Sequence, residues 1–431
     1  MKRIKIGFIC QPFDNGGPPD PGGSIGLLTW ELARRLSRSY QVTVCAPRSP
    51  RQPAQEQWEG VQFNRVRLRP DYWLLDRPRR LHGPVGDRRD INSILYYSIY
   101  AARAARRLHL EKCDIIHIHN FSHFVPIARA FNRKAKIILH MHADWLLQFE
   151  RNLIAKRIAL ADAIIGVSEY VTAGIRRVFP EFAHRCFTVF NGCDVDRIKP
   201  QPEKDDSRLP SRIVFVGRLS PEKGLHVLID GFERVVKCRP DVFLEIIGPE
   251  AMVPQGFLVG LSSDPMVLGL KRFYNGRSYL ESLRGRLKDK LPGKVLFLGY
   301  LSREELIERL RQADLFVQPS IASEMFGMAV ADAMAAALPV VATWICGLPE
   351  VVADGATGLL VPPDNPDALA EAILHVLNDP QLSYAMGQAG RSRVERMFSW
   401  DVVVETLGAI YNGLLSGAPV TTLSGSCGNS V

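Results

Sequence analysis

Glu324 and Asp332 lie eight positions apart in the stretch SEMFGMAVADAMA, whose alanine-rich part is expected to form a helix from about Gly327. The free backbone amides at a helix start favour an anion, and a glycine there lets a phosphate approach the backbone. Two carboxylates would repel that phosphate unless they bind its hydroxyl-bearing attachments, because a carboxylate is a strong acceptor for sugar and ribose OH groups. The pattern indicates a sugar-phosphate site; the alternative for Asp332 is an exposed acid on a helix.

Two cations follow the predicted strand RIVFVG, which ends at Gly217. Arg218 and Lys223 stand in RLSPEKG, on a predicted loop before a helix whose first turn includes Leu225. Two cations on such a loop can neutralise a diphosphate and stabilise it as a leaving group. The other interpretation is a solvated basic loop.

Histidines are the chemical candidates in the first half of the chain. The predicted strand IILHMHAD carries His140 and His142, two residues apart and therefore on the same side of the strand. In HIHNFSH, strand alternation places His117 and His119 on one face, yet no carboxylate or cysteine completes a metal sphere. Polar lining of a site and metal binding are the alternatives for this second stretch.

The candidate charged residues and histidines lie at the ends of predicted strands. These strands alternate with helical stretches, as in parallel α/β units. The predicted strands of the two halves are KIGFIC, QVTVCAP, CDIIHIHN, KIILHMH, DAIIGVS and FTVFNG, then RIVFVG, DVFLEIIG, KVLFLGY, LFVQPS, PVVAT and TGLLV. We expect two doubly wound α/β domains facing each other across a cleft, with ligand at the carboxyl ends of the strands.

The 431 residues exceed what one hydrophobic core usually supports, so two domains are expected. The polar, proline-bearing stretch after FTVFNG indicates a linker. The predicted boundaries are an acceptor-binding domain at 1–195, the linker at 196–210, a nucleotide-sugar-binding domain at 211–398, a helix at 399–416 that packs back on the first domain, and a disordered tail at 417–431.

The composition is that of a soluble globular protein, with 46% hydrophobic and 23% charged residues. Lys and Arg exceed Asp and Glu by 54 to 45, and the net charge of +9 favours anionic partners. Eight scattered cysteines without a CxxC pair indicate reduced thiols, and MKRIKIGFIC indicates a first buried strand rather than a signal peptide. We therefore expect a cytoplasmic protein, with no nucleic-acid partner.

Several motifs together resemble glycosyltransferase family 4, the retaining enzymes with the GT-B fold. They are VGRLSPEKG, PSIASEMFGMAVADAMAAALPVVAT, CGLPE, GATGLLVPPDNPDAL and FNGCDVDRIKP, and the resemblance covers roughly Ile4 to Leu415. It implies a hexosyltransferase that moves a sugar from a nucleotide-diphosphate sugar, a UDP-sugar first and GDP-mannose next, to an acceptor hydroxyl with retention. It also implies transfer without a bound metal or other cofactor, so polar lining of the acceptor side is preferred for HIHNFSH.

The resemblance assigns roles to the second half of the chain. Arg218 and Lys223 would hold the donor diphosphate, Glu324 would contact the donor sugar, and Asp332 would take the acidic position that binds the ribose. Asp332 departs from the family's Glu at this position and is one methylene shorter, so its contact could be bridged by water. The remaining donor-binding residues implied here are Gly217, Phe326, Gly327 and Met328.

In the first half, the resemblance assigns Gly22 and Gly23 of PDPGGSIG to the glycine loop near the donor phosphates. GGSIG is not a GxGxxG fingerprint, and alone it would more often be a flexible loop. His142 matches the family's active-site histidine, with His140 as its competitor. His119 is a further candidate on the acceptor side.

Acceptor identity is not encoded in a recognisable motif. The stretch 48–92 is an insertion in which residues 48 to 89 hold ten arginines against five acids, with Trp58, Tyr72 and Trp73 nearby. Such a segment suits a phosphorylated or lipid-linked acceptor, or peripheral contact with an anionic membrane, and a small-molecule or glycan acceptor stays open. A solvated variable loop is the alternative, and a second insertion, 249–293, has no assigned role.

Three other functions fit parts of this pattern. A nicotinamide dehydrogenase uses a similar sheet, but the missing GxGxxG argues against it. A nucleotide-sugar epimerase of the same fold would consume donor without an acceptor. A degenerate, non-catalytic sugar-binding protein is the remaining alternative, because Asp332 departs from the family pattern.

Overall fold

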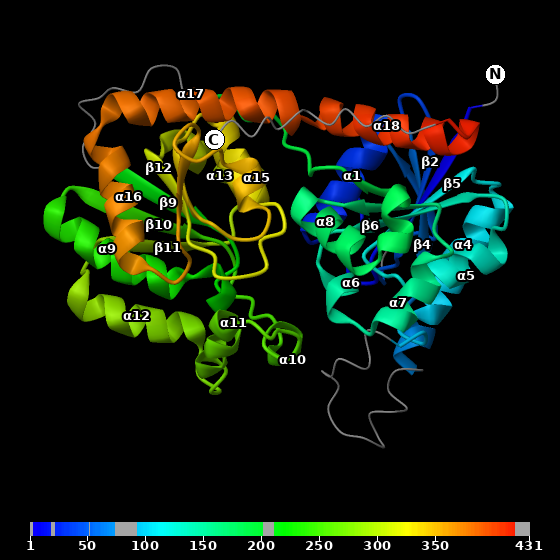
Figure 1. Cartoon of the computed structure of the whole chain (residues 1–431), viewed down its shortest axis with the longest axis horizontal. Helices are drawn as coiled ribbons and strands as arrows, with labels where there is room; N and C mark the ends of the chain where they lie inside the picture. The colour runs from blue at the N-terminus through cyan, green and yellow to red at the C-terminus, as the bar shows by residue number, and fades with distance from the viewer. Residues whose placement is uncertain (1–2, 19–21, 51, 74–92, 201–210, 419–431) are drawn as a thin grey trace. The chain divides into compact units, whose positions relative to one another are not determined.

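The computed structural model describes residues 3–18, 22–50, 52–73, 93–200 and 211–418. Most of the predicted linker 196–210 and of the predicted tail 417–431 lies outside these residues, as does 74–92 of the arginine-rich stretch. The chain forms two compact units, Met1–Asn191 with Trp400–Val431 and Gly192–Ser399 (Figure 1). The chain therefore leaves the first unit at Asn191 and returns to it at Trp400.

The first unit is built on an eight-stranded sheet in the order β3-β4-β2-β1-β5-β6-β7-β8. All neighbouring strands are parallel except the antiparallel pair β3 and β4. The strands are β1 Lys5–Ile9, β2 Gln41–Pro47, β3 Gln55–Trp58, β4 Val61–Val66, β5 Ile115–His119, β6 Lys136–Met141, β7 Ala163–Gly166 and β8 Cys186–Thr188. The helices are α1 Ser24–Leu36, α4 Ser98–Leu110, α5 Phe124–Phe131, α6 Trp145–Gln148, α7 Arg151–Ile158, α8 Glu169–Val178, η1 Pro180–Arg185 and α18 Trp400–Ser416.

Strands β3 and β4 correct the interpretation of a solvated loop for residues 55–66, because they add an antiparallel hairpin to the sheet edge. β3 has no buried residue, and the buried positions of β4 include Asn64 and Arg65, so neither strand shows an apolar run. Asn64 donates to Glu111 Oε1 at 2.9 Å, and Arg65 pairs with Glu56 Oε1 at 2.6 Å. Polar contacts therefore hold these two strands, whereas the other strands were predicted from their runs of apolar residues.

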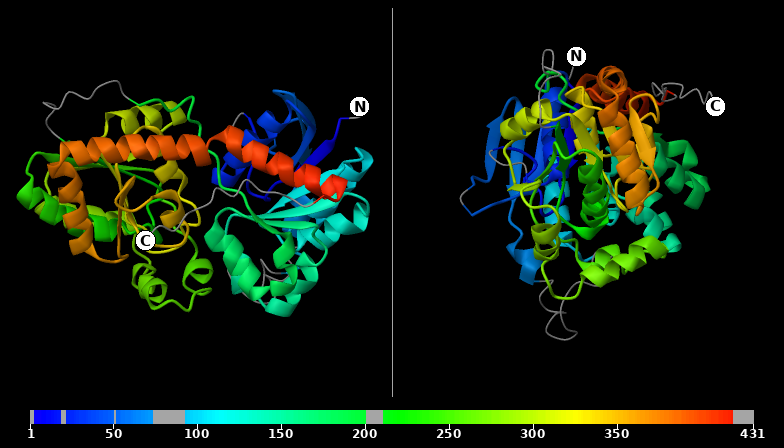
Figure 2. Two further views of the ribbon diagram at one scale, coloured as in Figure 1. Left: turned by 45° about the horizontal axis from the view of Figure 1, so that its top comes forward. Right: turned by 90° about the vertical axis from the view of Figure 1, so that its left-hand side faces the viewer.

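The C-terminal helix α18 belongs to the core of the first unit. Val403, Leu407, Ile410 and Tyr411 are buried in the same cluster as Ile6 and Val44 of the sheet, together with apolar residues of α1. Arg35 of α1 lies over the Trp400 ring at 5.2 Å. Figure 2 shows α18, in red, running along this unit. The first unit is thus completed by the last helix of the chain.

The second unit has a fully parallel six-stranded sheet in the order β11-β10-β9-β12-β13-β14. Its strands are β9 Ser211–Val216, β10 Val242–Ile247, β11 Val295–Gly299, β12 Leu315–Gln318, β13 Val340–Thr343 and β14 Gly358–Val361. Its helices are η2 Pro221–Lys223, α9 Leu225–Cys238, α10 Gln255–Leu258, α11 Pro265–Gly269, η3 Leu270–Phe273, α12 Tyr279–Lys290, α13 Arg303–Gln312, α14 Met328–Ala335, α15 Leu348–Val351, α16 Pro366–Asn378 and α17 Pro380–Met397. All twelve predicted strands of the two halves are present.

The second insertion, 249–293, is a packed part of the second unit. It forms α10, α11, η3 and α12, and Leu258, Val267 and Leu283 are buried in the same cluster as the β9 and β10 side chains. Tyr279 at the start of α12 accepts from the backbone N–H of His226 at 3.2 Å.

Among the described residues, none of the helices has the length and apolar character needed to span a bilayer.

Candidate active site

The predicted site residues fall into two groups, one in each unit. In the second unit, the loop after β9 and the loop after β12 bring Lys223 and Glu324 together. Lys223 Nζ donates to Glu324 Oε2 at 2.6 Å, and the two side chains are only 12% and 13% exposed. Gln318 and Ser320 donate to the same oxygen at 3.3 and 3.1 Å. A nearly buried cation and a carboxylate are thus held side by side at the carboxyl ends of two neighbouring strands.

Gly224 explains how these two loops come so close. It adopts φ +71°, and a Cβ there would lie 1.9 Å from the carbonyl oxygen of Pro319. Only glycine accepts both the left-handed conformation and this contact without strain. Lys223, which precedes Gly224, therefore lies next to the end of β12, where the loop that leads to Glu324 begins.

The second predicted cation, Arg218, is paired differently. Its Nη2 lies 3.1 Å from Glu222 Oε1, and Ser220 donates to that oxygen at 2.6 Å. Arg218 is more than a third exposed, whereas Glu222 is fully buried with Oε2 lacking a partner in the described residues. Glu222 was not predicted, because i,i+4 spacing brings side chains together on a helix and Arg218 lies before η2. Arg218 is thus held at the surface of the unit by a buried acid.

The other predicted donor-binding residues lie after β9 or at the start of α14: Gly217, Phe326, Gly327 and Met328. Gly217 follows β9 and donates its N–H to Ile247 at 2.9 Å. α14 begins at Met328, and Gly327 before it adopts φ +96°, which explains the glycine at the predicted helix start. The ring of Phe326 is buried and packs edge to face on Phe398 at 5.3 Å, so this residue supports the loop from inside.

Asp332 is held by protein groups rather than exposed on a helix. It is 8% exposed, and its carboxylate binds both terminal nitrogens of Arg303, with Nη2 at 2.9 Å from Oδ1. Cys193 Sγ lies 3.3 Å from the same Oδ1. The nearby Asp332 carboxylate raises the pKa of the Arg303 guanidinium. Sequence analysis did not find Arg303, because the first residue of α13 carries no motif.

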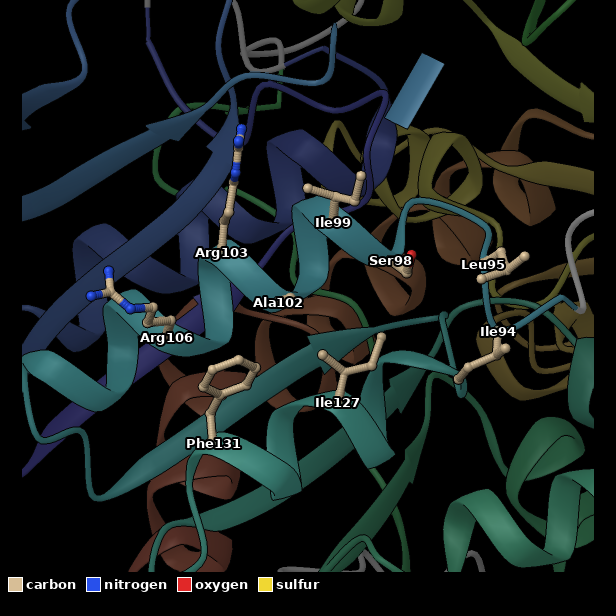
Figure 3. Close-up of a pocket in the computed structure, with 9 residues that line it drawn as sticks. All are labelled: Ile94, Leu95, Ser98, Ile99, Ala102, Arg103, Arg106, Ile127 and Phe131. Carbon is tan, nitrogen blue, oxygen red and sulfur yellow. The ribbon is translucent and has the colours of Figure 1, made fainter. Parts of the chain in front are cut away.

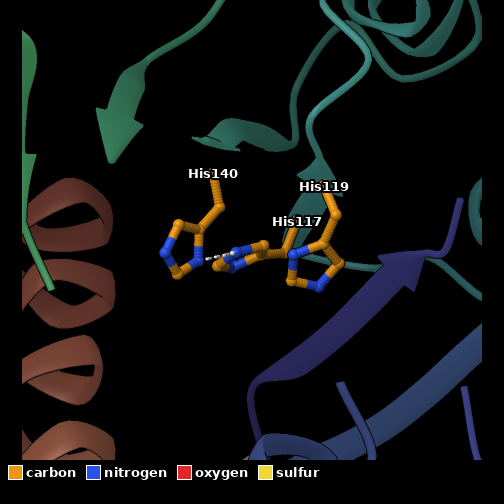
Figure 4. Close-up of side chains that lie close together, drawn as sticks. All are labelled: His117, His119 and His140. Carbon is orange, nitrogen blue, oxygen red and sulfur yellow. Dashed lines mark hydrogen bonds between the residues drawn. The ribbon is translucent and has the colours of Figure 1, made fainter. Parts of the chain in front are cut away.

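In the first unit, four histidines gather on one face of the sheet. His117 and His119 lie on β5, His140 lies on β6 beside His119, and His142 follows β6. His117 Nε2 is 3.1 Å from His140 Nδ1, and His119 Nδ1 is 2.9 Å from His142 Nε2. Figure 4 shows His117 between His119 and His140. The structure therefore brings the predicted His119, His140 and His142 together, and His140 is the more deeply buried of the two competitors.

Burial sets the protonation of this cluster. It lowers the pKa of His119 to about 3, and it lowers the pKa values of His117, His140 and His142 well below the ordinary value for histidine. All four rings are therefore neutral near pH 7. A neutral imidazole offers one N–H donor and one acceptor nitrogen, so it can serve as a base, a hydrogen-bond partner or a metal ligand.

A chain of hydrogen bonds joins the glycine loop to the histidines. Gly23 donates its N–H to Asp14 Oδ1 at 3.2 Å, and Gln11 donates to Asp14 Oδ2 at 2.7 Å. Asn120 donates to Gln11 at 3.2 Å and accepts from the His142 N–H at 2.7 Å. Gly22 adopts φ +84°, and Gly23 caps α1. Sequence analysis missed Gln11, Asp14 and Asn120, whose types alone are not distinctive in loops.

Comparison with known proteins identifies the family. The family model described as "Glycosyltransferase Family 4" matches residues 25–197, and the one described as "Glycosyl transferases group 1" matches residues 196–393. A mannosyltransferase of Corynebacterium glutamicum, described as GDP-mannose-dependent and acting on a monoacylated phosphatidylinositol monomannoside, is 30% identical over 63% of this chain and 69% of its own. The chain belongs to glycosyltransferase family 4.

This family 4 glycosyltransferase is also similar to other known proteins in sequence or in fold. Spore coat protein SA of Bacillus subtilis is 24% identical over 91% of this chain and 96% of its own. Sucrose-phosphate synthase of Thermosynechococcus elongatus superposes with a TM-score of 0.72, at 20% identity, over 96% of this chain and all of its own. Anabaena HepE in complex with UDP superposes with a TM-score of 0.67, at 19% identity, over 95% of this chain and all of its own. The predicted GT-B fold is confirmed.

Proposed function

We propose that this glycosyltransferase moves a hexose from a nucleotide-diphosphate sugar to an acceptor hydroxyl with retention at the anomeric carbon. The Lys223–Glu324 pair carries the proposal. A sugar diphosphate needs a cation beside its phosphates and, next to it, a carboxylate that accepts hydrogen bonds from the sugar hydroxyls. Two similar proteins support UDP or GDP as the nucleotide: HepE was solved in complex with UDP-glucose, and the mannosyltransferase of Corynebacterium glutamicum is GDP-mannose-dependent.

In the proposed step, the bond between the anomeric carbon and the diphosphate breaks, and negative charge develops on the leaving oxygen. Lys223, Arg218 and the amides at the start of α14 stabilise this charge, which is the largest catalytic contribution available to the site. The oxygen of the incoming hydroxyl forms the new bond to the anomeric carbon on the face that the diphosphate leaves, and the diphosphate accepts the proton of that hydroxyl. Because protein cations neutralise the diphosphate, the donor site needs no divalent ion.

Donor binding requires an exchange of partners at Glu324. In the described structure, Glu324 Oε2 accepts from Lys223, Gln318 and Ser320. A bound donor places phosphate beside Lys223 and a sugar hydroxyl beside Glu324, so both charges keep a partner. Asp332 takes the ribose, since each carboxylate oxygen has two lone pairs and Arg303 engages only one on Oδ2.

His142 is the proposed active-site histidine of the first unit, and His119 is its positioning partner. The backbone of His142 is fixed by Asn120, and its ring is fixed by His119 at 2.9 Å. Its neutral imidazole can accept a hydrogen bond from a donor or acceptor hydroxyl. We also assign donor binding to Gly22 and Gly23, in the short loop before α1 of the same unit.

For the acceptor, we propose a lipid-linked or phosphorylated molecule met at an anionic membrane surface. A groove of about 470 Å³ runs between α4 and α5, and its walls are mostly apolar (Figure 3). Leu95 is 53% exposed beside it and Phe131 is 38% exposed. Arg103 and Arg106 of α4 also line the groove. Exposed apolar groups flanked by arginines suit an anionic lipid surface.

The test is calorimetric titration of UDP, GDP, ADP and NAD into the purified protein with a chelator present. Saturable binding of one nucleoside diphosphate is expected, followed by transfer from the matching nucleotide-sugar with retained anomeric configuration. Binding of NAD alone, or of none of the four, would overturn the proposal. Donor consumption that yields an epimer without any acceptor would favour the epimerase of the same fold.

A further inference from the structure

The histidine cluster of the first unit is assembled from two neighbouring strands. His117 and His119 alternate along β5, and the parallel register sets His140 of β6 beside His119. The ligand nitrogens of these three side chains all lie within 4.8 Å of one another. Each side chain is almost completely buried. The stretch HIHNFSH alone does not reveal this set, because its third member comes from the next strand, while His123 binds the carbonyl of Tyr96 instead.

The nitrogen positions suit a small cation. His117 Nε2 and His140 Nδ1 are 3.1 Å apart, close to the roughly 3.3 Å between two ligands that lie about 2.0–2.1 Å from a tetrahedral ion. In the described part of the chain, His119 Nε2, His140 Nε2 and His142 Nδ1 have no hydrogen-bond partner. These three nitrogens are the ring positions opposite those in the 3.1 and 2.9 Å contacts, so an ion held by the contacting nitrogens leaves them available to water.

One ligand already has an outer partner that would orient it. His117 Nδ1 lies 2.8 Å from the hydroxyl of Tyr411 on α18. If Nδ1 carries the proton and donates it to Tyr411, the Nε2 lone pair points toward His140. Such an outer hydrogen bond is the usual arrangement for a metal-bound histidine. Neutral imidazole is the form that binds metal.

We propose that His117, His119 and His140 bind one divalent transition-metal ion, with Zn²⁺ as the first candidate. Imidazole ligands favour zinc, cobalt or nickel over magnesium and calcium, which prefer oxygen. The fourth position is open to water or to His142, whose Nε2 is 2.9 Å from His119 Nδ1. The ion would tie β5 and β6 to each other and, through Tyr411, to α18.

This inference goes beyond the proposed function, because the proposed donor chemistry in the second unit requires no metal. It also changes the expectation that the chain binds no metal, which rested on the family and on the missing third ligand. The competing explanation is a cluster of neutral imidazoles that is completed by water alone.

The experiment uses the full chain without a polyhistidine tag, stripped with a chelator and then exposed to Zn²⁺ or Co²⁺. After gel filtration, elemental analysis is expected to find one ion per chain, and bound Co²⁺ is expected to show the visible absorption of a four-coordinate site. Zinc is also expected to raise the unfolding temperature, since it binds only the folded state. A wild-type protein that retains no ion and develops no cobalt absorption would overturn the proposal.

Variants locate the ion. His117→Asn and His140→Asn should each lose the stoichiometric ion, whereas His184→Asn, at an exposed histidine of the same unit, should keep it. Tyr411→Phe should weaken metal affinity by about 10- to 100-fold without removing a ligand. Equal metal content in His117→Asn and the wild type would also overturn the site. Circular dichroism verifies folding, and nucleotide binding with a chelator present tests the donor site separately.

Discussion

At the scale of single residues, Lys223 is expected to affect catalysis more than donor affinity. Lys223→Ala removes a cation from the developing charge of the leaving diphosphate, and kcat should fall by about 10²- to 10³-fold. The same change on α9, Lys237→Ala, lies on an exposed lysine and should leave kcat unchanged. Steady-state kinetics with a fixed acceptor measure both. Wild-type turnover in Lys223→Ala would exclude the assigned role.

Asp332 and Arg303 allow structural and ligand roles to be separated. Asp332→Asn removes both the ion pair and the ribose acceptor, so it should lower stability and weaken UDP binding by about tenfold. Arg303→Gln breaks the same ion pair but leaves the carboxylate, so it should lower stability and leave UDP affinity nearly intact. Thermal unfolding and calorimetry give the two readouts. Equal losses of UDP affinity in both variants would argue against a ribose contact by Asp332.

His226 gives a pH prediction. Burial lowers its pKa from 6.5 to about 3, with Arg272 and Arg286 adding to the shift. Above pH 6.5 the His226 ring is neutral in the folded and the unfolded state, so it does not change the free energy of unfolding. Below pH 6.5 the ring binds a proton in the unfolded chain but stays neutral in the folded protein. The free energy of unfolding should therefore fall as pH drops, by about 2 kcal/mol between pH 6.5 and 5 from this group.

The control for this prediction is the variant His226→Gln. Its free energy of unfolding should decrease less per pH unit than that of the wild type, by the slope that corresponds to about one bound proton. Denaturant unfolding at pH 7, 6 and 5 compares the variant with the wild type. Parallel pH profiles for the two proteins would show that another group controls acid sensitivity.

At the scale of elements, the sequence was sufficient where strands are continuous apolar runs. β1, β5 and β12 were predicted because they are buried on both faces, as in other parallel sheets. β3 and β4 were missed because their partners are charged or amide side chains, and that pairing is invisible in a local pattern. Glu324 was predicted because it lies within a recognisable motif. The roles of Arg303 and Glu222 became apparent only in the folded chain.

The histidines show the same limit from the other side. Alternation along β5 correctly placed His117 and His119 on one face. The register between β5 and β6, which brings His140 to His119, depends on tertiary packing and could not be obtained from either strand alone. His140 was therefore not counted beside His117 and His119 as a possible ligand, and the expectation of no metal stays a prediction.

The groove between α4 and α5 leads to a prediction for these elements. The double variant Arg103→Glu, Arg106→Glu should reduce binding to vesicles of anionic phospholipid by at least tenfold, since two cations near such a surface contribute about 1 kcal/mol each and the reversed charges repel it. Both arginines are exposed, so folding should be unaffected. Sedimentation with anionic and zwitterionic vesicles measures the effect.

The matched control is Arg234→Glu together with Arg396→Glu, which reverses two exposed charges in the second unit. It should retain wild-type vesicle binding. If the wild type binds neither kind of vesicle, or if both double variants bind equally well, the groove is not a membrane contact.

At the scale of the whole molecule, the chain path makes the first unit dependent on the last helix. Leu407 is completely buried in the core cluster that includes Ile6 and Val44, although nearly four hundred residues separate it from β1. Leu407→Ala should destabilise the first unit by about 2–5 kcal/mol, because it leaves a cavity in a packed core. The second unit has its own core cluster and should be unaffected.

Hydrogen exchange followed peptide by peptide can separate the two responses. In Leu407→Ala, protection should fall in β1, β2 and β5, while β9, β10 and β12 keep wild-type protection. Leu415→Ala, at an exposed position of the same helix, should change neither set. An equal loss of protection in both units would mean that they unfold as a single cooperative body, and the division at Asn191 and Trp400 would then describe packing without describing stability.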